Sequence, residues 1–155
     1  MKSALGCRCA LLLAVGCGGP NVGFDPPISS QPLSGQIDGQ PWRLGTGEAA
    51  FVRGVSAVQY LLELYPVTFE PCVVFGAPSD AKIVTMVAPT KVGTYHLGFE
   101  MTATLHTPGA DFECISTEGK LVLDSITATT ITGGLRAACG SDNTVDGQFQ
   151  ATICP

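Results

Sequence analysis

The stretch Val58-Gln59-Tyr60-Leu61-Leu62-Glu63-Leu64 points to a β fold, because it is apolar at every second position from 58 to 64. Gln59 and Glu63 stand at positions in between, and successive side chains of a strand point to opposite faces. The pattern therefore predicts a strand with one buried face. A helix over residues 55–64 is the alternative, although it lacks a clear stop signal, and Pro66 would end either element.

Similar short runs follow along the chain, rich in Val, Ile, Thr and Phe and separated by Gly, Pro, Asp or Asn. They cover residues 49–53, 69–75, 82–87, 94–97, 101–107, 112–116, 120–126, 130–138 and 145–153. Many short strands with frequent turn signals predict an all-β protein, a single antiparallel β-sandwich or barrel-like domain of about 8–10 strands. We expect this domain to span residues 34–155, which is the size of one domain with one core.

The first sixteen residues have the three parts of an export signal. Lys2 and Arg8 supply positive charge, residues 10–15 form a short apolar run, and Gly16 is the small residue before a cleavage site. The apolar run is much shorter than the roughly 20 residues that span a bilayer. We therefore predict a signal peptide at residues 1–16 and no transmembrane helix there.

Residues 13–17, Leu-Ala-Val-Gly-Cys, resemble the lipobox of bacterial lipoproteins, with Ala14 where the family prefers a larger aliphatic residue. The resemblance implies that Cys17 is acylated with diacylglycerol and becomes the new N-terminus. Gly18 after it implies, by the same resemblance, an outer-membrane location. Cleavage after Gly16 by an ordinary signal peptidase is the alternative.

The number of cysteines favours lipidation of Cys17. The chain has seven, and Cys7 and Cys9 leave with the signal. The mature chain then holds an odd number, and an odd thiol in an exported protein needs an explanation. Acylation of Cys17 leaves an even four for disulfides.

Those four are Cys72, Cys114, Cys139 and Cys154, which permit three pairings. In the predicted strands, Cys114 and Cys139 share the parity of the apolar residues, whereas Cys72 and Cys154 are out of phase with them. Because side chains on opposite faces of a sheet cannot bridge, parity weakly favours Cys72 with Cys154 and Cys114 with Cys139. A single bulge would overturn this preference. Zinc is the rival use of four cysteines, but the chain has no C-x2-C pair.

Residues 17–33 are rich in Gly, Pro, Asn and Ser and show no hydrophobic periodicity. We expect the lipidated Cys17 followed by a flexible linker. At ~3.1 Å per residue, such a linker holds a domain up to roughly 50 Å from the bilayer.

The charge of the chain excludes some partners. The whole chain carries a formal net charge of −5, and removal of Lys2 and Arg8 with the signal lowers it to −7. Without a basic stripe, nucleic-acid binding is not expected. The same charge repels anionic headgroups, so the N-terminal lipid is the expected membrane contact.

Residues 140–147 form the most polar constellation, in which Asp142, Asn143 and Asp146 offer oxygen ligands for calcium. No twelve-residue EF-hand loop is present, and Asp, Asn and Gly are also what a hairpin turn requires. We favour the plain turn and expect no cofactor and no metal.

The remaining candidates for chemistry are few. His96 and His106 would approach each other if their strands paired as a hairpin, although exposed strand histidines are the favoured interpretation. The chain contains no G-x-S-x-G motif and no Gly-rich phosphate loop, so we do not expect an enzyme. Four aromatic residues are candidates for a glycan- or protein-binding patch, with burial in the core favoured instead: Trp42, Tyr60, Tyr65 and Tyr95.

Three segments, 34–42, 92–97 and 145–149, resemble uncharacterised β-rich domains common among bacterial lipoproteins. This resemblance implies a fold and an address but no activity. The sequence therefore predicts a lipid-anchored β domain of the cell envelope that binds a protein or glycan partner or has a structural role. The alternatives are a small secreted hydrolase with an unrecognised site and a calcium-dependent binding module. The oligomeric state stays open.

Overall fold

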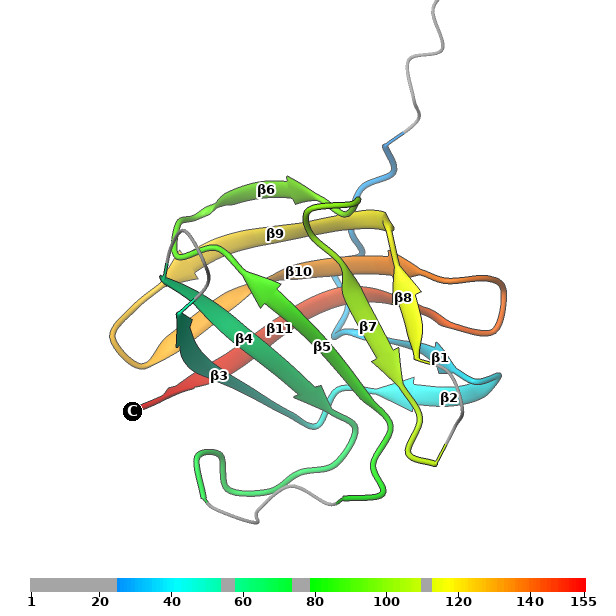
Figure 1. Cartoon of the computed structure of the whole chain (residues 1–155), viewed down its shortest axis with the longest axis horizontal. Coiled ribbons are helices and arrows are strands. Elements are labelled where there is room, and N and C mark those ends of the chain that lie inside the picture. The colour runs from blue at the N-terminus through cyan, green and yellow to red at the C-terminus, as the bar shows by residue number, and fades with distance from the viewer. Residues whose placement is uncertain (1–24, 54–57, 74–78, 110–112) are drawn as a thin grey trace, which may run out of the picture.

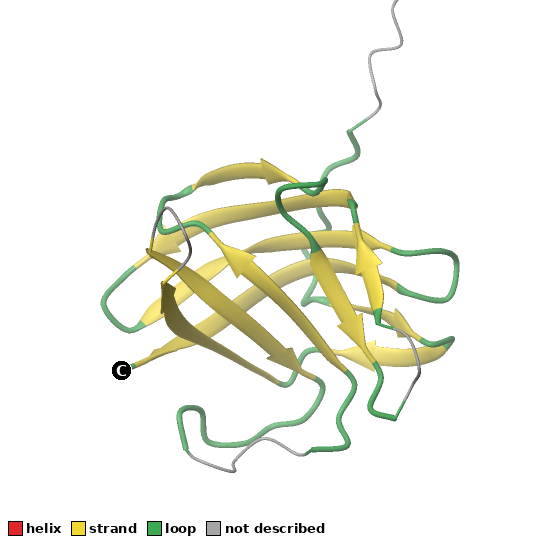
Figure 2. Ribbon diagram, in the orientation of Figure 1, coloured by secondary structure: helices red, strands yellow, loops and turns green. Residues whose placement is uncertain are grey.

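The computed structural model describes residues 25–53, 58–73, 79–109 and 113–155. These ranges contain strands and loops and no helix, so the predicted all-β class is confirmed (Figure 2). None of the described residues belongs to a helix long and apolar enough to cross a membrane. The strands are β1 (Ser34–Ile37), β2 (Gln40–Arg43), β3 (Thr46–Arg53), β4 (Val58–Tyr65), β5 (Ile83–Ala88), β6 (Gly93–His96), β7 (Ala103–His106), β8 (Cys114–Ser116), β9 (Glu118–Ile126), β10 (Thr130–Ala138) and β11 (Thr144–Cys154).

All eleven strands belong to one hydrogen-bonded sheet, whose main path runs β6-β9-β10-β11-β3-β4-β5-β7-β8. The sheet curls into an open half-barrel, so that β3, β4, β5, β7 and β8 lie in front of β9, β10 and β11, with β6 along the top (Figure 1). The strands thus form one continuous sheet rather than two separate ones. The sheet is also mixed rather than antiparallel throughout, because β11 pairs in parallel with β3 over residues 152–154.

The core lies between the two halves of the sheet and is supplied by alternate residues of the long strands. In β4, Tyr60, Leu62 and Leu64 are buried, while Gln59 and Glu63 lie on the outer face of the sheet. The strand expected from this alternation is confirmed, and the helix alternative over residues 58–64 is wrong. Fully buried side chains from neighbouring strands complete the core: Val84, Leu105, Leu121, Ile131, Leu135 and Val145.

A hairpin that the sequence did not predict precedes the core strands. Strands β1 and β2 pair antiparallel around Asp38 and Gly39, whose φ angles are 54° and 65°. Asp-Gly is the dipeptide that a two-residue hairpin turn with two positive φ angles favours. The hairpin carries Ile37 and Trp42 into the core.

Residues 25–33, which we name the strap, lie against the outer face of the sheet instead of forming part of a free linker. Ser29 donates its backbone N–H to Asp146 Oδ1 at 3.0 Å, and Gln148 Nε2 donates to the Ser29 carbonyl at 2.8 Å. The strap ends on Leu33, which is fully buried and donates its N–H to the Gln148 carbonyl. The flexible part of the predicted linker 17–33 therefore does not extend through residues 25–33.

The strand expected at residues 69–75 is wrong for its described part, because residues 69–73 form a turn and no strand. Pro71 removes a backbone donor, and Cys72 has a φ of 67°, which no strand residue adopts. The loop is instead fixed to the outer face of β3. The Thr46 hydroxyl bonds both the N–H and the carbonyl of Phe69.

Candidate binding surface

The predicted lipidation residue Cys17 lies outside the described residues. Four of the seven cysteines form the disulfides Cys72–Cys154 and Cys114–Cys139. This is the pairing that strand parity favours. The parity argument does not hold for Cys72, because this residue lies in a loop and not in a strand. It reaches the outer-facing Cys154 from that loop.

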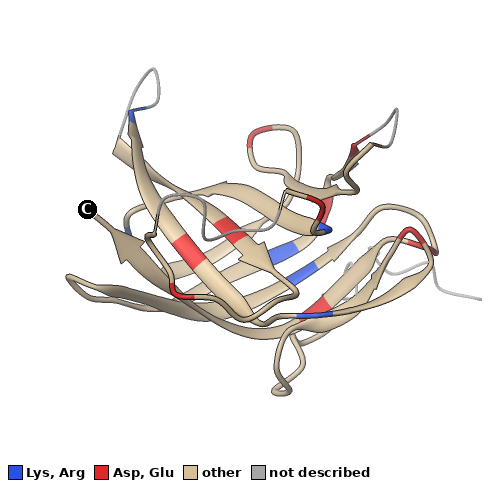
Figure 3. Cartoon of the chain, turned by 90° about the horizontal axis from the view of Figure 1, so that it is seen from below, with Lys and Arg blue, Asp and Glu red and all other residues tan. Residues whose placement is uncertain are grey.

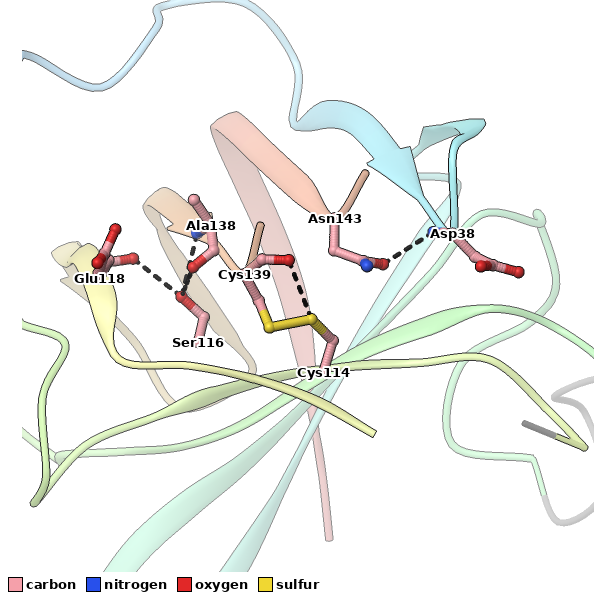
Figure 4. Close-up of a disulfide and its surroundings, with 7 residues drawn as sticks. All are labelled: Asp38, Cys114, Ser116, Glu118, Ala138, Cys139 and Asn143. Carbon is pink, nitrogen blue, oxygen red and sulfur yellow. Dashed lines mark hydrogen bonds between the residues drawn. A yellow bond between two sulfur atoms is a disulfide. The ribbon is translucent and has the colours of Figure 1, made fainter. Parts of the chain in front are cut away.

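The disulfide Cys114–Cys139 and the neighbouring Ser116 cover the edge of the sheet at β8 (Figure 4). The buried Ser116 hydroxyl accepts the Ala138 N–H at 3.0 Å and donates to the Ala138 carbonyl at 2.7 Å. These bonds link β8 to the end of β10 in place of strand pairing. The β8 edge is therefore tied to the other half of the sheet.

Two carboxylates lie directly opposite each other on the outer face of β3 and β4. Glu48 pairs in register with Glu63, and the Glu48 carboxylate accepts the backbone N–H of Cys72. It also lies within 4.8 Å of the sulfurs of Cys72 and Cys154. Because those sulfurs are joined as a disulfide, they offer no thiolate to a metal.

The nearby Tyr65 is buried beneath the loop and packs edge-on against Phe69. Its burial, followed by the charges of Glu63 and Glu48, raises the pKa of the Tyr65 hydroxyl to about 12. The phenol therefore stays protonated to a higher pH than an ordinary tyrosine does. This cluster could not be recognised from the sequence, because its members come from β3, β4 and the loop that follows β4.

The three calcium candidates are engaged with different neighbours. Asn143 Oδ1 accepts the Asp38 N–H at 2.8 Å, and the Asp142 carbonyl accepts the Gly39 N–H at 2.9 Å. Asp146 lies on β11, where it binds the strap and faces Arg136 Nη1 at 3.8 Å. The segment thus works as the turn that we favoured and also supports the β1–β2 hairpin.

The two histidines are not brought together by a hairpin. Strand β6 with His96 pairs with β9, whereas β7 with His106 pairs with β5. His106 Nδ1 lies 3.2 Å from a carboxylate oxygen of Glu113. The hairpin considered from the sequence is therefore wrong.

The four aromatic candidates are mainly core residues, as favoured from the sequence. Trp42, Tyr60 and Tyr65 are buried, and the Trp42 indole donates to the Lys82 carbonyl at 2.8 Å. Tyr95 packs at the edge of the core. Among the described residues, two aromatic side chains that the sequence did not single out are exposed: Phe51 on β3 and Phe99, whose relative exposure is 104%.

Three grooves meet around β6 and the loop 97–102 that follows it. The first, of about 370 Å³, lies on the outer face of β4, β5 and β7 and includes Gln59, Thr85 and Thr104. The second, of about 520 Å³, lies along β6 and includes Thr94, His96 and Phe99. Glu100 and Met101 line both grooves. We name residues 93–102 the rim, because they form the border that these grooves share.

The third groove, of about 560 Å³, joins the rim to the strap and has His96, Lys120 and Arg136 in its wall. These three residues lie directly opposite one another on β6, β9 and β10, and Asp146 on β11 continues the row. Lys120 is only 9% exposed, and its Nζ lies 3.0 Å from Asp25 Oδ2 of the strap. Elsewhere the charged residues are scattered over strands and loops rather than gathered in one stripe (Figure 3).

No family model, curated protein or solved structure matches the chain. The assignment of function therefore depends on the residues and their geometry alone.

Proposed function

We propose that the protein is an exported lipoprotein that is anchored to the outer membrane through acylated Cys17 and binds a partner through its β domain. The observation that carries this proposal is the use of the cysteines. The two disulfides occupy Cys72, Cys114, Cys139 and Cys154, so Cys17 is the odd cysteine of a chain cleaved after Gly16. Two disulfides are also consistent with an extracytoplasmic location.

The grooves around the rim favour binding over catalysis. The groove along β6 is bordered by a loop, and its ionisable side chains are Tyr95, His96 and Glu100. In the groove beside the strap, both cations are already engaged, Lys120 with Asp25 and Arg136 with Asp146, and Glu118 also lines the wall. Among the described residues, these grooves present surfaces for contact rather than a nucleophile held by a base.

The strap sets how far the domain can stand from its anchor. The described part of the chain begins at Asp25, whose carboxylate lies 3.0 Å from Lys120 Nζ. The chain between Cys17 and Asp25 spans at most about 25 Å at ~3.1 Å per residue. We infer that the domain is held close to the membrane and that the strap fixes which face turns toward it.

Labelled palmitate tests the anchor in the native host. We expect the wild-type protein to incorporate the label and the Cys17→Ala variant to lose it, because the acyl chains are attached to that residue. Cys7→Ala is the matched control, since this cysteine leaves with the signal, and it should keep the label. A wild-type protein without label, or a labelled Cys17→Ala variant, would contradict the proposal.

A further inference from the structure

We propose that Cys72, Cys154 and Glu48 form a zinc site once the disulfide between the two cysteines has been reduced by a dithiol. In the oxidised protein, which is the form seen in the structure, the same two sulfurs are joined to each other. These three residues line none of the grooves around the rim, so the site adds a function beyond the proposed partner binding. Its basis is a set of three ligand atoms that the fold holds together.

The three residues come from separate parts of the fold. Cys72 lies in the loop after β4, Cys154 is the last residue of β11, and Glu48 lies on β3. A carboxylate oxygen of Glu48 and the two sulfurs all lie within 4.8 Å of one another. Thiolate sulfur and carboxylate oxygen are both zinc ligands, with bonds of about 2.3 Å and about 2.0–2.2 Å. Three protein ligands leave the fourth tetrahedral position to water.

The backbone spacing suits both chemical states of the cysteines. The Cα atoms of Cys72 and Cys154 are 5.3 Å apart. Two sulfurs on one tetrahedral zinc ion lie about 3.8 Å apart, as follows from Zn–S bonds of about 2.3 Å. Rotation about the two Cα–Cβ bonds brings the sulfurs to that spacing. Reduction and metal binding therefore require no displacement of either backbone segment.

Contacts other than the S–S bond hold the ligands in place. Cys154 belongs to the parallel pairing of β11 with β3. The Glu48 carboxylate accepts the backbone N–H of Cys72, which keeps the carboxylate beside that residue. The Thr46 hydroxyl fixes the same loop through its two hydrogen bonds to Phe69. The three ligands therefore stay close together after the disulfide is broken, and a site that is already ordered binds its ligand at a lower entropic cost.

The charges around the site favour a divalent cation. Glu48 faces Glu63 directly across β3 and β4, and like charges at such positions repel each other. Within the part of the chain that the structure describes, neither carboxylate forms an ion pair with Lys, Arg or His. A zinc ion bound to Glu48 reduces this repulsion.

The second disulfide provides a comparison within the same molecule. Cys114 packs against the core, and its bridge to Cys139 ties β8 to the end of β10 (Figure 4). Among the described residues, no His, Asp or Glu completes a three-ligand cluster with this pair. Cys72, in contrast, is exposed in its loop. Because access limits thiol–disulfide exchange, a dithiol reduces Cys72–Cys154 first.

The reduction is a thiol–disulfide exchange. A thiolate of the dithiol attacks Cys72 Sγ, the S–S bond breaks, and Cys154 leaves as a thiolate that takes up a proton. The second thiol of the reductant then attacks its partner sulfur and releases Cys72 as a thiol. The reductant leaves as a disulfide and has given up two electrons and two protons. Zinc binding afterwards displaces the two thiol protons to solvent.

Limited reduction of the purified protein, followed by removal of the reductant and titration with zinc alone, tests the site. Mapping of alkylated peptides should show Cys72 and Cys154 modified at least about tenfold faster than Cys114 and Cys139. Native mass spectrometry should then show one zinc ion on the reduced protein and none on the oxidised protein. Cobalt(II) in place of zinc should give a sulfur-to-metal charge-transfer band, which reports thiolate ligands.

Glu48→Gln tests the third ligand. Its amide oxygen still accepts the Cys72 N–H, so the variant should fold, but it lacks the carboxylate charge. We expect its zinc affinity to fall at least about tenfold, measured by competition with a chromophoric chelator. Glu70→Gln is the matched control, because Glu70 is exposed in the same loop and belongs to no ligand cluster, and it should bind zinc like the wild type.

Several results would overturn the inference. An unchanged affinity in Glu48→Gln would mean that the cysteines bind zinc without a folded site. Equal binding to the oxidised protein would indicate an adventitious ion only, and the absence of zinc on the reduced protein would remove the site. Equal alkylation of all four cysteines, or a far-ultraviolet circular dichroism spectrum of an unfolded chain with zinc present, would contradict a site that opens within the intact fold. The palmitate experiment on Cys17 is independent of each of these results.

Discussion

Tyr65 shows how residues distant in the sequence form one electrostatic unit. The phenol is buried under the loop that contains Phe69, and the carboxylates of Glu63 and Glu48 lie opposite each other beside it. Two like charges in register are unfavourable in a sheet. The backbone N–H of Cys72 compensates part of this cost by donating to Glu48.

This arrangement predicts a loss of stability at high pH. The pKa of Tyr65 is raised from its ordinary value of 10.0 to about 12 in the folded protein. The stability linked to the protonated phenol is fully present below pH 10 and is lost as the pH rises from 10 to about 12. Tyr65→Phe should therefore show a shallower decline in the free energy of unfolding over this range, measured by urea denaturation.

A charge-neutral substitution checks the cause of the shift. Glu63→Gln should lower the pKa of Tyr65 toward 10, followed by tyrosinate absorbance, because it removes the nearer of the two charges. Glu70→Gln is the control. Glu70 is exposed in the loop that covers Tyr65, and its substitution should leave the Tyr65 titration unchanged. A Tyr65 titration that is the same in both variants would mean that burial alone sets the value.

At the scale of single elements, period-two alternation was a reliable guide for the long strands. Residues 58–64, 120–126, 130–138 and 145–153 all lie within observed strands, since one face of each is buried in the core. The run at 69–75 misled in its described part, residues 69–73, because these residues form a loop in which Phe69 packs against Tyr65 and Val73 is exposed. The hairpin around Asp38 and Gly39 was missed, although the dipeptide itself is a hairpin signal.

The strap was predicted as part of a flexible linker because its composition is rich in Pro and Ser. Composition indicates which backbone conformations are favoured, but not what a segment packs against. The prolines of the strap disfavour a helix, but they do not prevent its packing against the sheet. Ile28 lies against Gly134, where an added Cβ would come within 2.9 Å of Ile28 Cγ2. Glycines at such positions make room for the strap, and the sequence alone does not show what fills that room.

Gly147 provides the test of the strap. It has a φ of 145°, and an added Cβ would lie 2.6 Å from the Gln31 carbonyl oxygen and 2.7 Å from Leu33 Cα. Gly147→Ala should therefore displace the strap and cost more than the ~1 kcal/mol of an unfavourable φ alone. Limited proteolysis should then cut within residues 25–33.

Gly140→Ala is the matched control for this variant. Its φ of 75° carries a similar backbone cost, but no atom lies within 4 Å of the added Cβ. We expect a loss of about 1 kcal/mol with the strap still protected from protease. Equal stability loss and equal cleavage in the two variants would contradict the role of the strap.

The whole molecule combines one curled sheet, two disulfides and a strap that packs on the outer face of the sheet. The rim could not be predicted from the sequence, because β6 pairs with β9 from much farther along the chain and the grooves form only when the sheet curls. The odd number of cysteines expected after signal cleavage, by contrast, can be counted from the sequence alone. In the structure four of the seven cysteines pair, and under the proposed cleavage after Gly16 the remaining one is Cys17.

Intact mass measurement of the protein purified from its host, after denaturation and alkylation with and without reduction, tests the central claim most directly. We predict a chain that begins at Cys17, carries acyl mass on that residue, takes up no alkyl group before reduction and takes up four after it. A mature chain with an alkylated Cys17, or with a free thiol among the other four before reduction, would contradict the account.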